Sequence, residues 1–118
     1  MDSESLKLRT KQFALRNIRL VGSISGGTVN NVLKSQLVRS ATSVAANYRE
    51  ACRSRSNAEF VAKLGIVEQE LDESLLWIEL LVESGIVPES KLADLMKEAD
   101  ELLRIVVSSI RTARINKK

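Results

Sequence analysis

The chain has 118 residues, of which 44% are hydrophobic, 28% charged and only 3% aromatic, with a formal net charge of +3. This composition predicts one compact domain over residues 1–118 with an aliphatic core, and the scarcity of aromatic residues argues against a surface on which bases stack. Histidine is absent and Cys52 is the single cysteine, so we expect no metal, no cofactor and no disulfide within the chain.

Glycine and proline interrupt the chain in three places and predict four helices. The first covers about residues 5–24 and ends before Gly26 and Gly27, because glycine costs about 1 kcal/mol relative to alanine in a helix. The second covers about 29–53, with Thr28 as its expected N-cap. The third covers about 57–84, where Ser56 and Glu59 have the spacing of a capping box.

The fourth helix is expected over about 88–114, with Pro88 in its first turn and Gly85 closing the helix before it. Apolar residues recur at steps of mostly three and four along each helix. The stripes are Leu6, Phe13, Leu20 and Ile24; Val29, Val32, Leu33, Leu37, Val44 and Tyr48; Phe60, Leu64, Val67, Leu71, Ile78 and Leu81; and Leu92, Leu95, Ala99, Leu102, Val106, Ile110 and Ala113. Because the connections are short, the helices must alternate in direction, which predicts an all-α, antiparallel up-down-up-down four-helix bundle.

A polar line runs along the second helix where a seam between helices would normally be apolar. A second line lies beside the apolar stripe of the third helix. If the two lines face each other, Arg39, Gln36, Asn47 and the serines donate hydrogen bonds to Glu70 and Glu73, which would otherwise be costly buried charges. The predicted polar network or interface consists of Gln36, Arg39, Ser40, Ser43, Asn47, Glu50, Glu70, Glu73 and Trp77. We expect Arg39→Ala to destabilise the assembly.

Glu70 and Glu73 also have an alternative interpretation, as an acid–base pair with hydroxyl and amide neighbours. The chain has no histidine, no glycine-rich phosphate loop and no context that would activate a cysteine. We therefore expect a protein that is not an enzyme, in which Cys52 is a small packing residue.

Three segments carry a resemblance to a known family. They are residues 36–51 (QLVRSATSVAANYREA), residues 59–64 (EFVAKL) and the pattern of Glu70, Glu73, Ser74, Trp77 and Ile78. From about Phe13 to Ile110 the chain resembles the bacterial four helix bundle protein family encoded by intervening sequences in 23S ribosomal RNA genes. The resemblance implies an up-down four-helix bundle that assembles as a homopentamer. Relatives include the accessory protein of diversity-generating retroelements, a basic pentamer that binds nucleic acid and a reverse transcriptase, from which this chain differs in its acidic third and fourth helices.

The residues themselves also predict an oligomer. Residues 75–82 are apolar except for Glu79, and seven apolar side chains in such a run cannot all point at one four-helix core. A second buried face follows, so we expect the chain to bind copies of itself. The resemblance, and not the residues, gives the number five.

Charge is distributed unevenly along the chain: residues 1–55 carry +7, residues 56–101 carry −9 and residues 102–118 carry +5. One interpretation is that oppositely charged helices pack side by side, within the fold or between subunits, in a scaffold or adaptor that also binds a partner protein. The alternative is salt-dependent, sequence-nonspecific binding of RNA or DNA. The candidate residues for that function are Arg9, Arg16, Arg19, Arg104, Arg111, Arg114 and Lys118.

Two features favour the cytoplasm. No disulfide framework is present, and residues 1–5 (MDSES) do not begin a basic and then apolar signal segment. The longest apolar runs, residues 75–78 and 80–82, are far shorter than the roughly 20 residues that cross a bilayer. We expect no association with a membrane.

Overall fold

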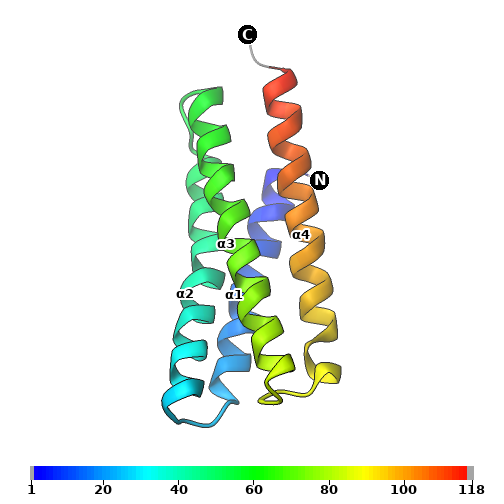
Figure 1. Ribbon diagram of the computed structural model, residues 1–118. Helices are drawn as coiled ribbons and strands as arrows, with labels where there is room; N and C mark the ends of the chain where they lie inside the picture. Colours follow the sequence, from blue (N-terminus) through cyan, green and yellow to red (C-terminus); the bar gives the residue numbers. More distant parts are fainter. Residues whose placement is uncertain (1, 117–118) are drawn as a thin grey trace.

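The fold is an antiparallel four-helix bundle, as the sequence predicts (Figure 1). The computed structural model describes residues 2–116. The helices are α1 (Ser3–Gly22), α2 (Thr28–Ala51), α3 (Asn57–Glu83) and α4 (Glu89–Ile115). They form a rod 51 Å long and 21 by 20 Å across.

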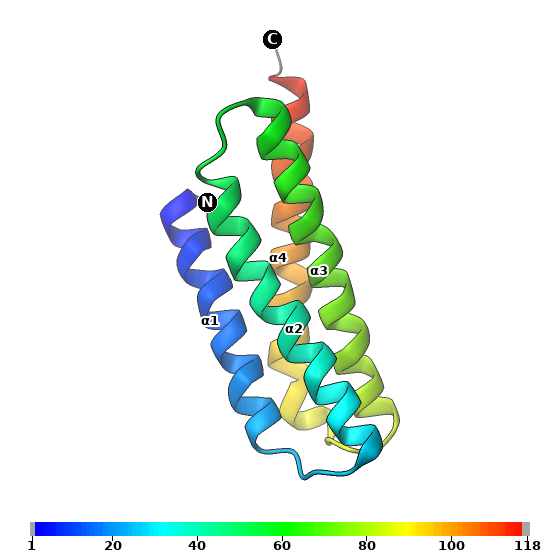
Figure 2. The same cartoon turned by 90° about the vertical axis from the view of Figure 1, so that its left-hand side faces the viewer.

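The helices follow one another around the bundle in chain order (Figure 2). α2 packs against α1 and α3, and α4 packs against α3 and, over a smaller surface, against α1. The α2–α3 connection lies at the same end of the rod as the start of α1 and the end of α4 (Figure 1). The α1–α2 and α3–α4 connections lie together at the opposite end.

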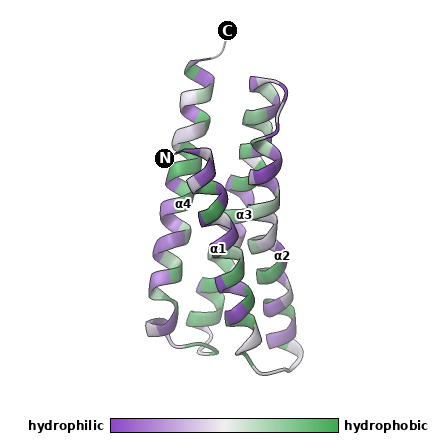
Figure 3. Ribbon diagram, turned by 180° about the vertical axis from the view of Figure 1, so that it is seen from behind, coloured by the Kyte–Doolittle hydropathy of each residue, from purple (hydrophilic) through white to green (hydrophobic). Residues whose placement is uncertain are grey.

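The core is built from the predicted stripes and is almost entirely aliphatic. Hydrophilic and hydrophobic residues alternate along the visible lengths of α1 and α4 in Figure 3, in keeping with one apolar face per helix. The largest fully buried side chains are Phe13, Leu37, Leu64, Leu71, Ile78, Leu81, Leu92, Leu102, Val44, Val67, Val106 and Asn17. Two members of the predicted stripes are not in the core: Val29 and Val32 of α2 are 64% and 56% exposed.

The helix ends differ from the sequence prediction by one or two residues, and in two places the difference has a clear cause. Thr28 is the first residue of α2 and not its cap; Gly27 takes the N-cap position at φ +131°, a conformation that only glycine adopts readily. Pro88 is the N-cap of α4, and the helix starts at Glu89.

The predicted capping residues at the two ends of α3 are confirmed. The Glu59 amide donates to Ser56 Oγ at 3.1 Å, which is the serine half of a capping box. At the other end Gly85 has φ +80°, and its amide donates to the Val82 carbonyl at 3.0 Å. These residues fix where α3 starts and stops, and therefore how its side chains are registered against α2.

Residues 2–116 contain neither a membrane-spanning helix nor a cluster of metal-ligating side chains. None of the helices is both long enough and apolar enough to cross a membrane. No group of three or more acidic or cysteine side chains in this part of the chain is arranged to hold a metal ion.

The cap of α3 leads to a stability prediction. Ser56→Ala should lower the free energy of unfolding by about 1 kcal/mol, because it leaves the Glu59 amide without its acceptor. Chemical denaturation followed by circular dichroism measures the change. Ser90→Ala is the matched control: Ser90 is exposed in the first turn of α4, and its removal should change stability by less than about 0.5 kcal/mol. Equal effects of the two substitutions would contradict the role of the cap.

Candidate functional site

The predicted polar lines of α2 and α3 face each other, and Arg39 joins them. Its Nη1 donates to Glu70 Oε1 at 3.2 Å, its Nη2 donates to Glu73, and its Nε donates to Gln36 Oε1 at 3.2 Å. One guanidinium group thereby connects Gln36 of α2 with Glu70 and Glu73, which lie about one turn apart on α3. Gln36, Arg39, Glu70 and Glu73 form what we call the Arg39 cluster.

A pair of buried hydroxyl groups lies next to this cluster, deeper in the seam between α2 and α3. Ser40 and Ser74 are both fully buried, and the Ser74 hydroxyl donates to Ser40 Oγ at 2.9 Å. Ser40 Oγ is within 3.2 Å of the Leu37 carbonyl, and Ser74 Oγ is within 2.8 Å of the Glu70 carbonyl. Ser74 was not among the predicted site residues, although it interrupts the apolar stripe of α3 between Leu71 and Ile78.

The remaining predicted residues do not reach the two carboxylates. Asn47 donates to the Ser43 carbonyl of its own helix at 2.9 Å, so the expected bond from Asn47 to Glu70 or Glu73 is wrong. A short amide side chain can satisfy itself on the preceding turn without crossing the seam. Glu50 pairs instead with Lys63 of α3 at 2.8 Å, and the hydrogen bond between them raises the pKa of Lys63.

Trp77 lies in the α3 line but makes no polar contact with it. Its indole Nε1 is buried, and no residue in the described range 2–116 accepts its hydrogen. The indole therefore contributes packing area to the bundle, where it contacts the hydrophobic core.

The Arg39 cluster is at the rim of the bundle and not in its core, which corrects the expectation of buried charges. The side chains of Arg39 and Glu73 are 47% and 42% exposed, and that of Glu70 is 16% exposed. Partial desolvation acts to lower the pKa of Arg39, but the charges of Glu73 and Glu70 outweigh it, and the pKa is raised. Within one bundle this is a surface ion-pair network.

Exposed apolar side chains continue the rim on either side of the seam. Val29 and Val32 precede Gln36 and Arg39 on α2 at steps of three and four, and Leu76 and Leu80 follow Glu73 on α3 in the same way. Leu76 is 46% exposed and Leu80 is 38% exposed. Because α2 and α3 are antiparallel and joined at Arg39, all four apolar residues lie on the same side of the cluster, toward the start of α2. We call Val29, Val32, Leu76, Leu80 and the Arg39 cluster the α2–α3 face.

A second charge network connects α1 to α4. Arg9 donates to both carboxylate oxygens of Glu98, at 3.0 and 2.6 Å, and its Nη2 is 3.2 Å from Glu101. The hydrogen bond with Glu98, together with the charges of Glu98 and Glu101, raises the pKa of Arg9. The basic first helix thus neutralises part of the acidic fourth helix. Arg9 is held by acidic groups of its own chain, and we remove it from the candidates for binding nucleic acid.

The other predicted nucleic-acid candidates divide between two helices: Arg16 and Arg19 are on α1, whereas Arg104, Arg111 and Arg114 line neighbouring grooves of α4. Arg104 pairs with Asp100 at 3.0 Å, and Lys118 lies outside the described residues. Arg19 is in the last turn of α1 and Arg114 is in the last turn of α4. Since these two helices are antiparallel, the two arginines lie toward opposite ends of the rod. Arg16, Arg19, Arg111 and Arg114 have no ion pair with any residue in the range 2–116.

Three further cations lie together, and the sequence did not predict their proximity. Lys11 of α1 and Arg49 and Arg53 of α2 and its end line one groove. They are far apart in the sequence, so only the packing of α1 against α2 brings them into proximity.

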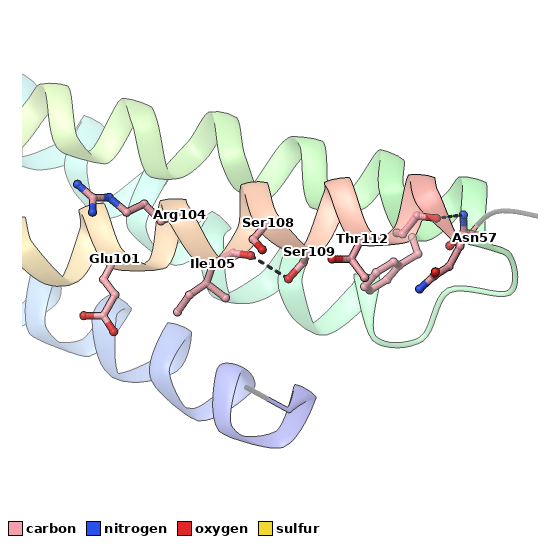
Figure 4. A pocket seen from close by; sticks show the side chains of 10 residues that line it. Asn57, Glu101, Arg104, Ile105, Ser108, Ser109 and Thr112 are labelled. Carbon is pink, nitrogen blue, oxygen red and sulfur yellow. Dashed lines mark hydrogen bonds between the residues drawn. The ribbon is translucent and has the colours of Figure 1, made fainter.

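A groove of about 780 Å³ lies beside the last turns of α4 (Figure 4). α1 has 20 residues and α4 has 27, so α1 does not cover this part of α4. The Asn57 side-chain amide donates a hydrogen bond to the Ala113 carbonyl, and the Ser109 hydroxyl donates one to the Ile105 carbonyl. The groove is lined by Asn57, Phe60, Glu101, Arg104, Ile105, Ser108, Ser109, Thr112, Ala113 and Asn116, a set without an activated nucleophile or a paired acid and base.

Comparison with known proteins gives a consistent result. The model of the family described as "23S rRNA-intervening sequence protein" matches residues 8–108. The fold is similar to that of a crystal structure from Bacteroides thetaiotaomicron, a protein of unknown function from the S23 ribosomal protein family, with a TM-score of 0.83 and 30% identity over 94% of this chain and 99% of the other. No protein with a curated description matches. The bundle, its polar seam and the match over residues 8–108 lead to one conclusion: the chain belongs to the 23S rRNA-intervening sequence protein family.

Proposed function

We propose that the protein is a homo-oligomeric scaffold or adaptor of the cytoplasm that performs no catalysis. The α2–α3 face carries this proposal. Four aliphatic side chains there are more than one-third exposed, and they adjoin a charged cluster whose members are already paired with one another. Such a combination of apolar area with satisfied polar groups is typical of the surfaces that proteins bury against each other.

A self-complementary contact also explains why the sequence has apolar residues at these positions. Val29, Val32, Leu76 and Leu80 add nothing to the core of a single bundle, and their exposure to water is unfavourable by about 25 cal/mol per Å². A neighbouring copy that covered the face would remove this cost. The resemblance to the intervening-sequence family supports a closed ring of five copies.

The same geometry argues against the alternative of a carboxylate enzyme. A general acid or base needs a carboxyl group that can exchange a proton with a substrate. Glu70 and Glu73 instead share the guanidinium of Arg39 in an ion-pair network. Neither the groove beside the end of α4 nor the groove between α1 and α2 is lined by Glu70 or Glu73.

The proposed interface predicts the oligomeric state of one variant. Leu80→Glu places a charge on the α2–α3 face and should shift the protein from an oligomer to a monomer in size-exclusion chromatography with light scattering. Leu8→Glu is the control, because Leu8 is also exposed, at 56%, but lies on α1 away from this face. A wild-type protein that is a stable monomer, or a control that dissociates while Leu80→Glu does not, would overturn the proposal.

Arg39 gives a second prediction, which separates the bundle from the assembly. In one bundle Arg39 is on the surface, so Arg39→Ala should have little effect on the unfolding of the monomeric Leu80→Glu variant. In the assembled protein the same substitution leaves two carboxylates unpaired inside an interface and should lower the thermal midpoint clearly. Differential scanning calorimetry of Arg39→Ala in both backgrounds tests this. Equal shifts in the two backgrounds would contradict a buried α2–α3 face.

A second candidate function is salt-dependent, sequence-nonspecific binding of RNA or DNA. The observation that favours it is a gathering of cations at the end of the rod that carries the α2–α3 connection. Lys11, Arg49, Arg53, Arg55, Arg111 and Arg114 are all exposed there, and none has an ion pair with a residue in the described part of the chain. Acidic residues such as Glu79, Glu83, Glu89 and Asp94 belong to the opposite half.

Fluorescence anisotropy with labelled oligo(U) and oligo(dT) tests this function. The affinity should fall as salt rises, because each neutralised phosphate releases counterions, and it should be similar for oligonucleotides of different sequence. Absence of binding at low salt, or binding that does not respond to salt, would exclude it.

A further inference from the structure

One groove brings together cations that nothing else in the fold accounts for. It lies between α1 and α2 near the end of α2, has a volume of about 490 Å³, and is lined by Lys11, Ala45, Ala46, Arg49, Glu50 and Arg53. Lys11 comes from α1 and the other five from α2 and the residues directly after it. None of the three charged side-chain groups has an ion pair or hydrogen bond with any residue between 2 and 116.

We propose that this groove, with Lys11, Arg49 and Arg53 as its ligating side chains, binds the phosphodiester backbone of a nucleic acid. The inference rests on the second function proposed above and names its site. Arg49 and Arg53 are not among the candidates that the sequence pattern suggests. The groove is therefore a different surface from the arginines of α4.

The charge of the groove is positive without compensation from its own lining. Glu50 is the one acidic residue in the lining, and Lys63 of α3 holds its carboxylate at 2.8 Å. Arg49 lies in the last turn of α2, where a cation is favourable beside the carbonyl ends of the helix. That effect accounts for one arginine, but it does not account for Lys11, which reaches the same groove from another helix.

The shape of the groove favours a polyanion over an acidic protein. The apolar residues of its lining are Ala45 and Ala46, which are small. The groove therefore has no large apolar pocket of the kind that anchors a protein partner. Arg49 is in the last turn of α2 and Arg53 lies two residues past the end of that helix, and both line the groove. Their guanidinium groups can each bind two phosphate oxygens, and Lys11 adds a third positive charge across the groove.

The lining also determines what kind of recognition to expect. It contains no aromatic side chain on which a base could stack and no amide side chain that could read a base edge. The contacts are therefore with phosphate alone. Binding through this groove is sensitive to salt and insensitive to sequence.

The test compares two variants with the same change of charge. The first is Lys11→Gln, Arg49→Gln and Arg53→Gln together. The second, a matched control, is Lys34→Gln, Lys91→Gln and Lys97→Gln, three cations that also lack ion pairs with described residues. Circular dichroism and thermal unfolding confirm that each variant folds, and anisotropy with labelled oligo(U) over a series of salt concentrations measures binding.

The groove variant should bind at least about tenfold more weakly at low salt, and the slope of log affinity against log salt should decrease by about 2, since each phosphate contact on a single strand contributes about 0.7. The control should retain most of the affinity and the slope. Replacing Arg49 and Arg53 by lysine should retain the slope and lose part of the affinity, because lysine keeps the charge without the fork.

Four results would overturn the proposal. If wild-type protein does not bind the oligonucleotide, the proposed function fails and the site with it. If wild-type protein binds but the groove variant is unchanged, the function stands and the site is wrong. If both variants lose affinity equally, binding follows overall charge and not this groove. Competition by inorganic phosphate alone, at concentrations equal to those of the nucleotide units, would identify a site for free phosphate and likewise exclude a backbone site.

Discussion

The hydrogen bond between Ser74 and Ser40 joins α2 and α3 within the buried seam between the two helices. Two small hydroxyl side chains replace the large aliphatic residues that usually occupy such a seam, so the two helix backbones can pack closely. Each hydroxyl also lies within hydrogen-bonding distance of a carbonyl of its own helix, so burial leaves neither unsatisfied. With this contact in place, Arg39 comes within reach of both Glu70 and Glu73.

Part of the charge in this fold is neutralised between neighbouring helices. Arg9 of α1 pairs with Glu98 and Glu101 of α4, and Arg39 of α2 pairs with Glu70 and Glu73 of α3. Cations without an ion pair to residues 2–116 remain at both ends of the rod, and Lys11, Arg49 and Arg53 line one groove near the α2–α3 connection. The surfaces proposed for self-association and for phosphate binding are thus separate, because one is made of aliphatic residues beside a satisfied ion-pair network and the other of cations beside alanines.

The number of helices, their order and their directions follow from the sequence because glycine, proline and the capping pattern of Ser56 act locally. The burial of particular side chains does not follow in the same way. Val29 and Val32 fit the helical stripe of α2, yet they fall on its outer edge, since a stripe of mixed three- and four-residue steps does not state which edge faces the core. Likewise, the spacing of Glu73 along α3 does not state how much of its side chain is exposed, and the side chain is 42% exposed.

Contacts between distant residues were harder to predict still. The pairing of Arg9 with Glu98 joins residues 89 positions apart, and the Lys11–Arg49–Arg53 groove requires α1 and α2 to be in register. Ser74 carried a signal that could have been used, because it is a polar residue at a core position of an otherwise apolar stripe.

The most direct measurement of the central claim is a double-mutant cycle on Ser40 and Ser74. The free energies of unfolding of Ser40→Ala, Ser74→Ala and the double variant would be compared with that of the wild-type protein. If the two hydroxyls are joined across the seam, the double variant is less destabilised than the sum of the single variants, with a coupling of about 0.5–1.5 kcal/mol. Additive effects, within about 0.3 kcal/mol, would show that α2 and α3 are not held together through these groups.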